Sequence, residues 1–338
     1  MKRIKLAIVG CGSWAQETHL PYLLAQPFVD IVGIVDITAD TNRQELAKRY
    51  SPSLLVSSLD DLLAKTAIDC AVISTPHATH FEIATQAVKR GVHVHVDKPL
   101  CSTVAEVKQL LRLAKEKQII ISTHTQRKYM VGIAQMRGLL QSKFTEVYHV
   151  SASLWQPVFE DFIGSWRSNK VLAAGGILMD SGYHLVDSIL FLLSVRASKQ
   201  VSNISALAHY ANHPNDAFAT LLFRANKSVV QINAFRGAPK TIKKEEYHVF
   251  GDGGYIKMSF GSNLSKKCRV SFWDSTGNSF SSKLLYVNPS YRVEPLKTFL
   301  NALMGNPEAK EIVRENVNLA MLSLGVQENA YALDAFGG

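Results

Sequence analysis

The chain has 338 residues, of which 47% are hydrophobic, and it carries a formal net charge of +9. This length and composition predict a globular protein, with two domains rather than one. The basic residues are scattered and form no stripe with interleaved aromatic residues, so nucleic acid is not an expected partner. The four cysteines lie far apart without a C-x-x-C pair, which argues against structural zinc and a disulfide scaffold and fits a reducing compartment.

The N-terminus bears a superficial likeness to a signal peptide. Lys2, Arg3 and Lys5 precede an apolar stretch, but this stretch is short and two glycines interrupt it. No run of residues approaches the length of a membrane span. We therefore expect a cytoplasmic protein that makes no membrane contact.

A short apolar strand at 5–9 leads directly into a G-x-G-x-x-A pattern at the start of a helix. The first glycine of such a pattern permits a tight turn, the second lets the backbone approach a pyrophosphate, and the small last residue keeps the helix close to the sheet. Unpaired N–H groups at the helix start attract the anion. A glycine-rich turn of another α/β protein is the alternative. We assign to a dinucleotide site Gly10, Gly12, Ser13, Trp14 and Ala15.

A second apolar run, 31–35, ends in Asp36. An acidic residue about 20 positions after the glycine pattern lies at the tip of the second strand and accepts hydrogen bonds from the ribose hydroxyls. Its carboxylate repels a 2′-phosphate, and Ile37 follows where an arginine would accommodate one. The sequence therefore favours NAD as the cofactor, while Arg43 nearby leaves NADP open.

Apolar strands alternate with helical patterns from residue 4 to about 123. Strands are expected at 5–9, 31–36, 54–57, 70–74, 93–96 and 119–123, and helices near 14–26, 40–50, 59–65, 80–90 and 103–117. This alternation predicts a parallel sheet with right-handed crossovers. We expect an α/β fold whose first domain, 1–124, is a Rossmann dinucleotide-binding domain.

The pattern changes after about residue 125. A helix at 132–141, a strand at 146–155 and a helix at 182–194 precede strand-like runs at 201–209, 217–223, 228–235, 247–250, 255–259, 269–272 and 283–287. Helices near 291–304 and 311–335 follow. Successive strands with few helices between them predict an α+β domain over 125–338 with an open, mostly antiparallel or mixed sheet. This domain is expected to supply the substrate site.

Lys98 follows Asp97 and precedes Pro99 at the end of the fifth strand. Ligands of open α/β sheets bind at the carboxyl ends of the strands. Lys98 is therefore placed to face the nicotinamide end of the cofactor, where it can orient a hydroxyl or move a proton. A surface lysine that pairs with Asp97 is an equally good interpretation.

Asp180, His184 and Asp187 are spaced i, i+4 and i+7, which on a helix puts all three on one face. A histidine is the natural acid–base group near neutral pH, and a carboxylate one turn away can fix its tautomer. Three alternatives stay open: a helix-capping Asp180, a buried structural histidine, and a metal site. No second ligand cluster is evident in the sequence, so no metal is expected.

Together these motifs resemble the glucose–fructose oxidoreductase / inositol dehydrogenase (Gfo/Idh/MocA) family. The set runs from residue 10 to 187, and its order is specific although each motif alone is not. It comprises the G-C-G-S-W-A loop, Ser74-Thr75-Pro76-His77 with His80, Gly91-Val92-His93-Val94 leading to Asp97-Lys98-Pro99, Gln126-Arg127, Trp166-Arg167 and G-G-x-x-x-D-x-G-x-H-x-x-D at 175–187.

The resemblance implies hydride transfer between NAD(P) and a sugar, cyclitol or related compound. It also implies a homodimer or homotetramer formed through the C-terminal sheet. Carried over by position, Lys98 matches the family's catalytic lysine, and Asp180 and His184 match the acid and the histidine near the reacting hydroxyl. The cofactor-side residues are Thr75, Pro76, His80, Lys98 and Asp97, the last being shorter by one methylene than the family's glutamate.

The mechanism that we expect is reversible. His184 takes the hydroxyl proton in oxidation and returns it in reduction, Lys98 holds the oxygen, and Asp180 orients His184 or a substrate hydroxyl. The sequence leaves the roles of His184 and Lys98 interchangeable. Two other functions use the same fold: a dinucleotide-sensing regulator without turnover, and an NAD-dependent glycosidase that oxidises its substrate transiently.

The loop after residue 154 offers aromatic faces and donors that suit a polyhydroxylated ring. We assign Trp155, Trp166 and Arg167 to a sugar-like substrate, together with Lys98, Asp180 and His184. Arg167 and the positive net charge leave room for an anionic substrate such as a nucleotide sugar. Core packing is an equally good interpretation of the two tryptophans.

Overall fold

The structure is a computed structural model that describes residues 3–37, 40–50, 52–157, 162–210, 213–239, 241–261 and 266–333, with the backbone alone described at 40–44. The chain divides into two compact units. The first comprises Met1–His124 and Arg292–Val317, and the second Thr125–Tyr291 and Asn318–Gly338. We describe each unit by itself.

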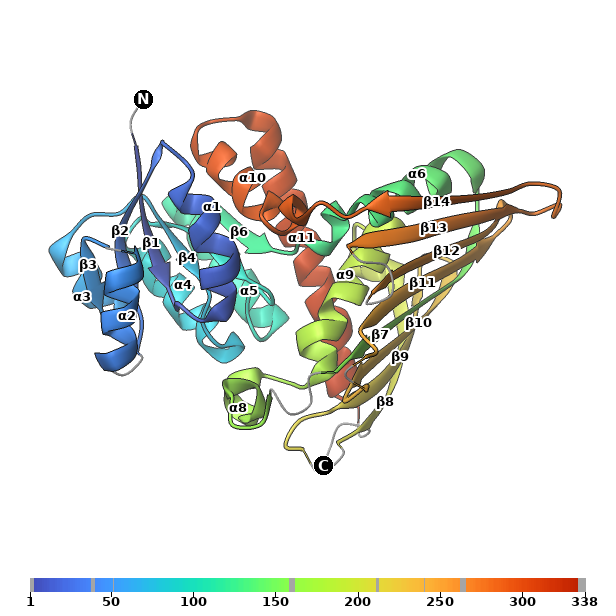
Figure 1. Ribbon diagram of the computed structural model, residues 1–338, viewed down its shortest axis with the longest axis horizontal. Coiled ribbons are helices and arrows are strands. Elements are labelled where there is room, and N and C mark those ends of the chain that lie inside the picture. Colours follow the sequence, from blue (N-terminus) through green and yellow to red (C-terminus); the bar gives the residue numbers. More distant parts are fainter. Residues whose placement is uncertain are drawn as a thin grey trace. The chain divides into compact units, whose positions relative to one another are not determined.

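The first unit is built on a six-stranded, fully parallel sheet in the order β3-β2-β1-β4-β5-β6 (Figure 1). Its strands are β1 (Ile4–Val9), β2 (Val29–Val35), β3 (Leu54–Val56), β4 (Cys70–Ile73), β5 (His93–Asp97) and β6 (Ile121–His124). The strand order reverses between β1 and β4, which is where doubly wound sheets bind dinucleotides. The predicted Rossmann domain is confirmed.

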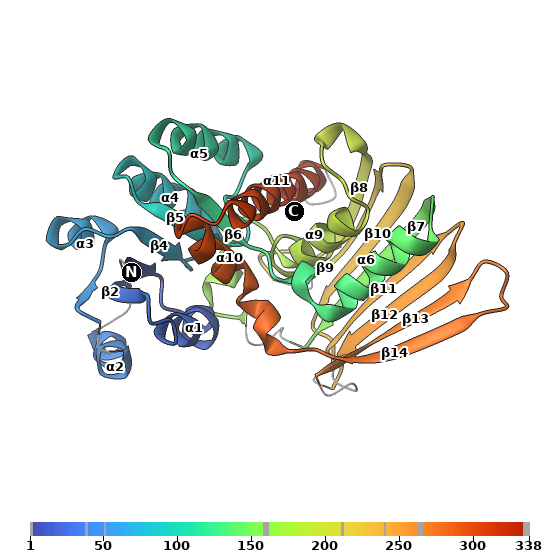
Figure 2. The same ribbon diagram turned by 90° about the horizontal axis from the view of Figure 1, so that it is seen from above.

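Helices cover both faces of this sheet. Figure 2 shows α3, α4 and α5 along one face and α1 and α10 along the other. The helical segments are η1 (Ala15–His19), α1 (Leu20–Leu24), α2 (Asp40–Tyr50), α3 (Leu59–Lys65), η2 (His77–Thr79), α4 (His80–Lys89), α5 (Val104–Lys117) and α10 (Glu294–Leu303). The helix expected at 14–26 is present, with a π-helical segment, η1, in place of its first regular turns and α1 after it.

Residues 292–317 group with the first unit, whereas the predicted second domain comprises everything after residue 124. The reason is the apolar side of α10. Leu296, Phe299 and Leu300 are fully buried in the cluster that contains Leu20 and Leu23 of α1. The end of the first unit falls within α11 (Pro307–Tyr331).

The second unit contains an eight-stranded sheet in the order β14-β13-β12-β11-β7-β10-β9-β8. Only β7 and β10 pair in parallel; the other pairs are antiparallel. The strands are β7 (Val147–Gln156), β8 (Val201–His209), β9 (Phe218–Ala225), β10 (Ser228–Arg236), β11 (Lys244–Gly251), β12 (Gly254–Gly261), β13 (Lys267–Asp274) and β14 (Phe280–Tyr286). The predicted mixed, mostly antiparallel sheet is confirmed.

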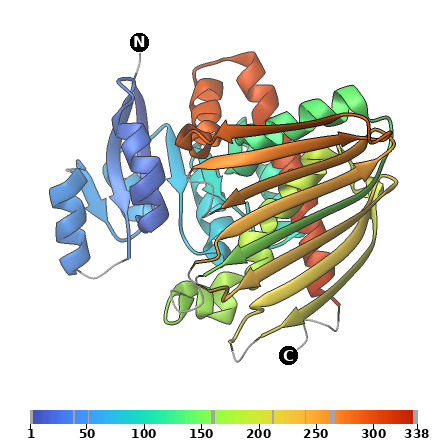
Figure 3. The ribbon, with the colours of Figure 1, turned by 45° about the vertical axis from the view of Figure 1, so that its right-hand side comes forward.

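One face of this sheet packs against helices α6 (Val131–Lys143), α9 (Tyr183–Leu192) and the second half of α11. Figure 3 shows the strands from the other face, with these helices behind them. The shorter segments are η3 (Arg127–Tyr129), η4 (Trp166–Ser168), α8 (Lys170–Ala173), η5 (Leu178–Gly182), η6 (Ser198–Gln200) and η8 (Pro289–Arg292). Within the part of the chain that the structure describes, no helix is long and apolar enough to cross a bilayer.

Candidate cofactor and substrate sites

The glycine loop has the geometry of a pyrophosphate cradle. Gly10 has φ +84°, and a Cβ added to it would lie 2.6 Å from the carbonyl oxygen of Ser74 and 2.7 Å from Cγ2 of Thr75. The tight turn and the close approach of β4 therefore both require glycine here. A Cβ added to Gly12 would meet no protein atom within 4 Å. The loop is thus open beside Gly12, where a dinucleotide approaches in this motif.

The rest of the motif continues from the loop into η1. Ala15 is fully buried against the sheet, as the motif requires for close helix packing. Ser13 is exposed and Trp14 is half-buried. The Trp14 ring lies edge-on to His124, with 5.9 Å between ring centroids, so Trp14 is directed toward the end of β6.

Asp36 lies immediately after β2 and beside the glycine loop. Its Oδ2 accepts a hydrogen bond of 2.6 Å from the backbone N–H of Cys11, and the residue is buried. This is the position of the ribose-binding acid in a Rossmann domain. Burial, with a further contribution from the Asp36 charge, raises the pKa of the Cys11 thiol to about 12, so the thiol stays protonated and unreactive at neutral pH.

His80 connects two of the predicted cofactor loops. Its Nδ1 lies 2.7 Å from the carbonyl oxygen of Pro99 and its Nε2 lies 2.8 Å from that of Thr75. Burial lowers the pKa of His80, and the neutral ring donates to one carbonyl at a time. His80 thus fixes the loops after β4 and β5, and both its nitrogens face backbone. Thr75 and Pro76 are half-buried at the end of β4.

The end of β5 is held by the side chain of Asp97. Its Oδ1 lies 2.8 Å from Nε2 of His19, and its Oδ2 accepts a hydrogen bond from the hydroxyl of Ser74. Although burial opposes ionisation, His19 and the Ser74 hydrogen bond hold the pKa of Asp97 below its usual range. Its oxygens are thus turned to neighbours in its own unit. Lys98, half-buried, comes next in the chain.

In the second unit, Asp180 lies in η5 between two arginines. Its Oδ2 is 3.0 Å from Nε of Arg167 and 3.5 Å from Nη2 of Arg236. Arg167 also stacks on Trp166, with Cζ 4.3 Å from the ring centroid. The structure therefore brings together three predicted residues, Asp180, Arg167 and Trp166. The N-cap of η5 is Ile177, so Asp180 is not a capping residue.

Arg236, the last residue of β10, is a partner that the sequence analysis missed. It is 1% exposed, and its guanidinium carbon lies 3.9 Å from the ring centroid of Phe162. The sequence of β10 contains a pattern from which this residue could have been found. Residues 230, 232 and 234 are apolar and buried, so the period of two places Arg236 on the same core-facing side. An arginine there requires a carboxylate partner.

The helix predicted to carry Asp180, His184 and Asp187 contains a π-helical turn. Asp180 belongs to a π-helical turn, and α9 begins only at Tyr183, so the spacing of a regular helix does not apply. His184 is half-buried in the first turn of α9. Asp187 is buried and 3.8 Å from Nζ of Lys128, and burial raises the pKa of its carboxyl group.

The side chain of Trp155 lies on the opposite side of β7 from η5, the segment that carries Asp180. Alternate residues of β7 face opposite sides, and Trp155 points away from α9, into a hollow of about 400 Å³. The other lining residues are Phe218, Phe235, Gly237, Ala238, Pro239 and Ile242. Its neighbour Gln156 faces η5 instead and accepts a 2.8 Å hydrogen bond from the Ser181 hydroxyl. This position does not support a role for Trp155 beside the other substrate residues.

Comparison with known proteins identifies the class. The family model for the oxidoreductase family with an NAD-binding Rossmann fold matches residues 4–125, and the model for the GFO/IDH/MocA C-terminal domain matches 133–257. The chain therefore belongs to the GFO/IDH/MocA family of NAD(P)-dependent oxidoreductases, as its motifs predicted.

Individual relatives are more distant. The scyllo-inositol 2-dehydrogenase (NADP(+)) IolW of Bacillus subtilis is 28% identical over 196 residues, which are 57% of this chain and 52% of that protein. The chain thus matches about half the length of such curated relatives. The 3-ketoreductase KijD10 of Actinomadura kijaniata, solved with NADP and TDP-benzene, has a TM-score of 0.81 at 18% identity, covering 97% of this chain and 98% of that one. The WlbA dehydrogenase of Bordetella pertussis, solved with NADH and UDP-GlcNAcA, has a TM-score of 0.80 at 19% identity, covering 99% and 97%.

The two glycines allow a direct test of the cradle. Gly12→Ala adds a methyl group that meets no protein atom, so we expect an unchanged melting temperature. Because the methyl group would occupy the open space beside Gly12, where this motif is expected to hold the pyrophosphate, NADH should bind at least about tenfold more weakly, roughly 1.4 kcal/mol. Fluorescence titration with NADH measures this. Gly138→Ala, which also meets no protein atom, is the control, and equal affinity in the two variants would contradict the assignment.

Proposed function

We propose that the protein transfers a hydride between a nicotinamide cofactor and a hydroxyl or carbonyl carbon of a sugar, cyclitol or sugar derivative. The observation that carries this proposal is the position of Lys98, at the carboxyl end of β5 in a domain whose glycine loop is open beside Gly12. A dinucleotide bound there supplies or accepts the hydride. The side chains of the protein hold the oxygen and move the proton.

Each proposed role follows from the chemistry of its group. Lys98 holds the substrate oxygen and stabilises its partial negative charge. His184 takes the proton in oxidation and returns it in reduction. Asp180, kept in place by Arg167 and Arg236, orients His184 or a substrate hydroxyl. On the cofactor side, Thr75, Pro76, Ser13 and Trp14 border the dinucleotide.

Two features support the finer assignments of cofactor and substrate. Asp36 beside the glycine loop favours NAD, because its carboxylate repels a 2′-phosphate. Arg167, with 35% of its side chain exposed, offers a cation next to the Trp166 ring, which suits an anionic sugar derivative. KijD10 and WlbA were solved with nucleotide ligands, so sugar nucleotides belong in the substrate panel.

All four cysteines are buried free thiols, which supports a reducing compartment such as the cytoplasm.

Loss of the proton carrier or the oxygen-holding group should abolish most of the turnover. With a substrate found by screening sugars, cyclitols and sugar nucleotides for a change in nicotinamide absorbance, Lys98→Met and His184→Ala should each lower kcat by roughly 10²- to 10⁴-fold. NADH affinity should remain close to that of the wild type in His184→Ala, because His184 is not assigned to the cofactor side. Lys108→Met and His209→Ala, at exposed positions, are the matched controls.

Near-normal turnover in both Lys98→Met and His184→Ala would reject the assignment of these residues. Conversion of substrate with no net change in nicotinamide absorbance would reject a dehydrogenase and indicate transient oxidation. Tight NADH binding without turnover on any member of the panel would favour a sensing role.

The charge of Asp36 should set the cofactor preference. Asp36→Asn keeps the shape of the side chain but removes the repulsion of a 2′-phosphate. We expect the ratio of kcat/KM for NADP to that for NAD to rise by roughly tenfold or more. Steady-state kinetics with both cofactors measure the ratio. A wild-type enzyme that prefers NADP, or a ratio that Asp36→Asn does not change, would contradict this interpretation.

We also propose that the chain forms a homodimer or homotetramer through the open face of the C-terminal sheet. Four aromatic rings stack across neighbouring strands on this face: Phe250, Tyr255, Trp273 and Phe280, with successive centroids 4.5, 5.0 and 4.8 Å apart. Phe250 and Phe280 are 44% and 60% exposed. Exposed rings in such a row are typical of a protein–protein interface.

The oligomer should depend on this row of rings. Light scattering coupled to size exclusion should give a dimer or tetramer for the wild type. Phe250→Lys should dissociate it, because the new charge would be buried in the interface. Leu24→Lys replaces an apolar residue of the first unit that is at least as exposed as Phe250, and it should leave the mass unchanged. A monomeric wild type would refute the proposal.

A further inference from the structure

Polar residues occupy the core-facing side of β5 and β6, the last two strands at one edge of the sheet in the first unit. His95 and Asp97 of β5 pair in register with Ser122 and His124 of β6. His19, carried by η1, lies against the same side, with 4.7 Å between its ring centroid and that of His124. Strands of a parallel sheet are usually apolar on both faces. This group of side chains therefore needs a physical explanation.

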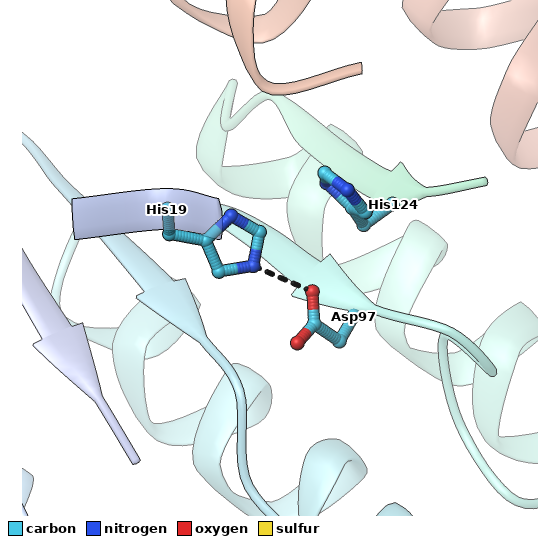
Figure 4. A group of neighbouring side chains, drawn as sticks. All are labelled: His19, Asp97 and His124. Atoms are coloured by element: carbon cyan, nitrogen blue, oxygen red, sulfur yellow. Dashed lines mark hydrogen bonds and ion pairs between the residues drawn. The ribbon is translucent and has the colours of Figure 1, made fainter. Parts of the chain in front are cut away.

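Three of these side chains converge on one point. A ring nitrogen from His19, a ring nitrogen from His124 and a carboxylate oxygen of Asp97 all lie within 4.8 Å of one another. Figure 4 shows the three side chains directed toward a common space from η1, β5 and β6. Both histidines are at most 1% exposed. The convergence is a property of the fold, because the three residues are far apart in the sequence.

Hydrogen bonds within the first unit leave a polar atom of the His19, Asp97 and His124 cluster without a partner. Nε2 of His124 is buried without a hydrogen-bond partner. An orphaned buried polar atom is costly and is rare in native proteins.

Neighbouring side chains fix the orientation of these groups. Nδ1 of His124 lies 2.9 Å from Nε2 of His95, and Nδ1 of His95 lies 3.0 Å from the Ser122 hydroxyl. With a proton on each of these Nδ1 atoms, both contacts are satisfied and Nε2 of His124 keeps a lone pair for a metal ion. Ser74 donates to the second oxygen of Asp97. Outer hydrogen bonds of this kind orient the ligands of metal sites.

We propose that His19, Asp97 and His124 bind one divalent transition-metal ion of the zinc class. Two imidazoles and one carboxylate, with a water molecule in the fourth position, form a common tetrahedral zinc ligand set. Bonds of about 2.0–2.1 Å require ligand atoms roughly 3.3 Å apart. His19 Nε2 and Asp97 Oδ1 are 2.8 Å apart in the structure, and small side-chain rotations would separate them to this distance. Magnesium and calcium, which prefer oxygen ligands, fit the site poorly.

Metal binding at this site requires neither a cofactor nor a substrate, although Asp97 also precedes Lys98 at the cofactor edge. The ion would link η1, β5 and β6 next to Lys98 and would stabilise this edge of the sheet. Metal binding can therefore be measured without a substrate or a cofactor. Failure of the metal experiment leaves the proposed oxidoreductase function untouched, and the converse also holds.

The first experiment uses the full-length wild-type chain, treated with a chelator and dialysed. We expect it to take up one Co²⁺ per chain, with the visible absorption of a tetrahedral nitrogen–oxygen site, and Zn²⁺ but not Mg²⁺ should displace the cobalt. Zn²⁺ should also raise the melting temperature. Absence of both the cobalt band and the shift in melting temperature overturns the proposal.

Variants then locate the ion. His19→Ala and His124→Ala should each weaken Co²⁺ binding at least roughly 100-fold, and His95→Phe, which removes only an outer hydrogen bond, roughly 10- to 100-fold. His209→Ala, at an exposed position, is the control and should bind as the wild type does. Asp97→Asn keeps the shape of its side chain and serves if an alanine variant does not fold. Cobalt binding that persists in every folded cluster variant overturns the proposal.

Discussion

The carboxylate of Asp97 holds together the edge of the first unit on which the proposed chemistry depends. It lies at the end of β5, accepts a hydrogen bond from Ser74 after β4, and pairs with His19 of η1. A buried carboxylate without such partners would favour the protonated form. Because these partners keep it ionised and fixed, the position of the next residue, Lys98, is fixed as well. The shorter side chain, compared with the family's glutamate, is turned inward to these neighbours.

A similar constraint operates in the second unit. Asp180 is a buried carboxylate held by Arg167 and Arg236, and it lies in a π-helical turn, as His19 does in the first unit. A π turn inserts an extra residue and changes the direction of the side chains that it carries, and such turns are frequent at functional sites. Both units therefore place a key polar side chain on an irregular helical turn and fix a carboxylate with cationic or imidazole partners.

The sequence predicts most of the fold because its signals are local and periodic. Alternating strands and helices, the glycine pattern and Asp36 are enough to define the Rossmann domain and its cofactor edge. The alternation along β10 would also have revealed Arg236 as a buried cation, and that along β5 and β6 would have placed His95 with Asp97 and Ser122 with His124. These are inferences that the pattern supports without a structure.

Other features depend on contacts distant in sequence. The π-helical turns have no periodic signal, so neither the approach of His19 to Asp97 nor the position of Asp180 could be read from spacing. Trp155 and Gln156 are both plausible substrate residues, and only the pairing of β7 with its neighbours decides which of them faces η5. The grouping of α10 with the first unit likewise rests on the burial of its apolar side among residues near the N-terminus.

Hydrogen-exchange mass spectrometry with and without NAD tests the central claim, that the carboxyl edge of the first sheet holds the dinucleotide. The account predicts slower amide exchange on NAD binding at 10–15, 74–80 and 97–99, with β8 and β9 unchanged. Equal exchange in these three segments at saturating NAD, or protection confined to the second unit, would contradict it.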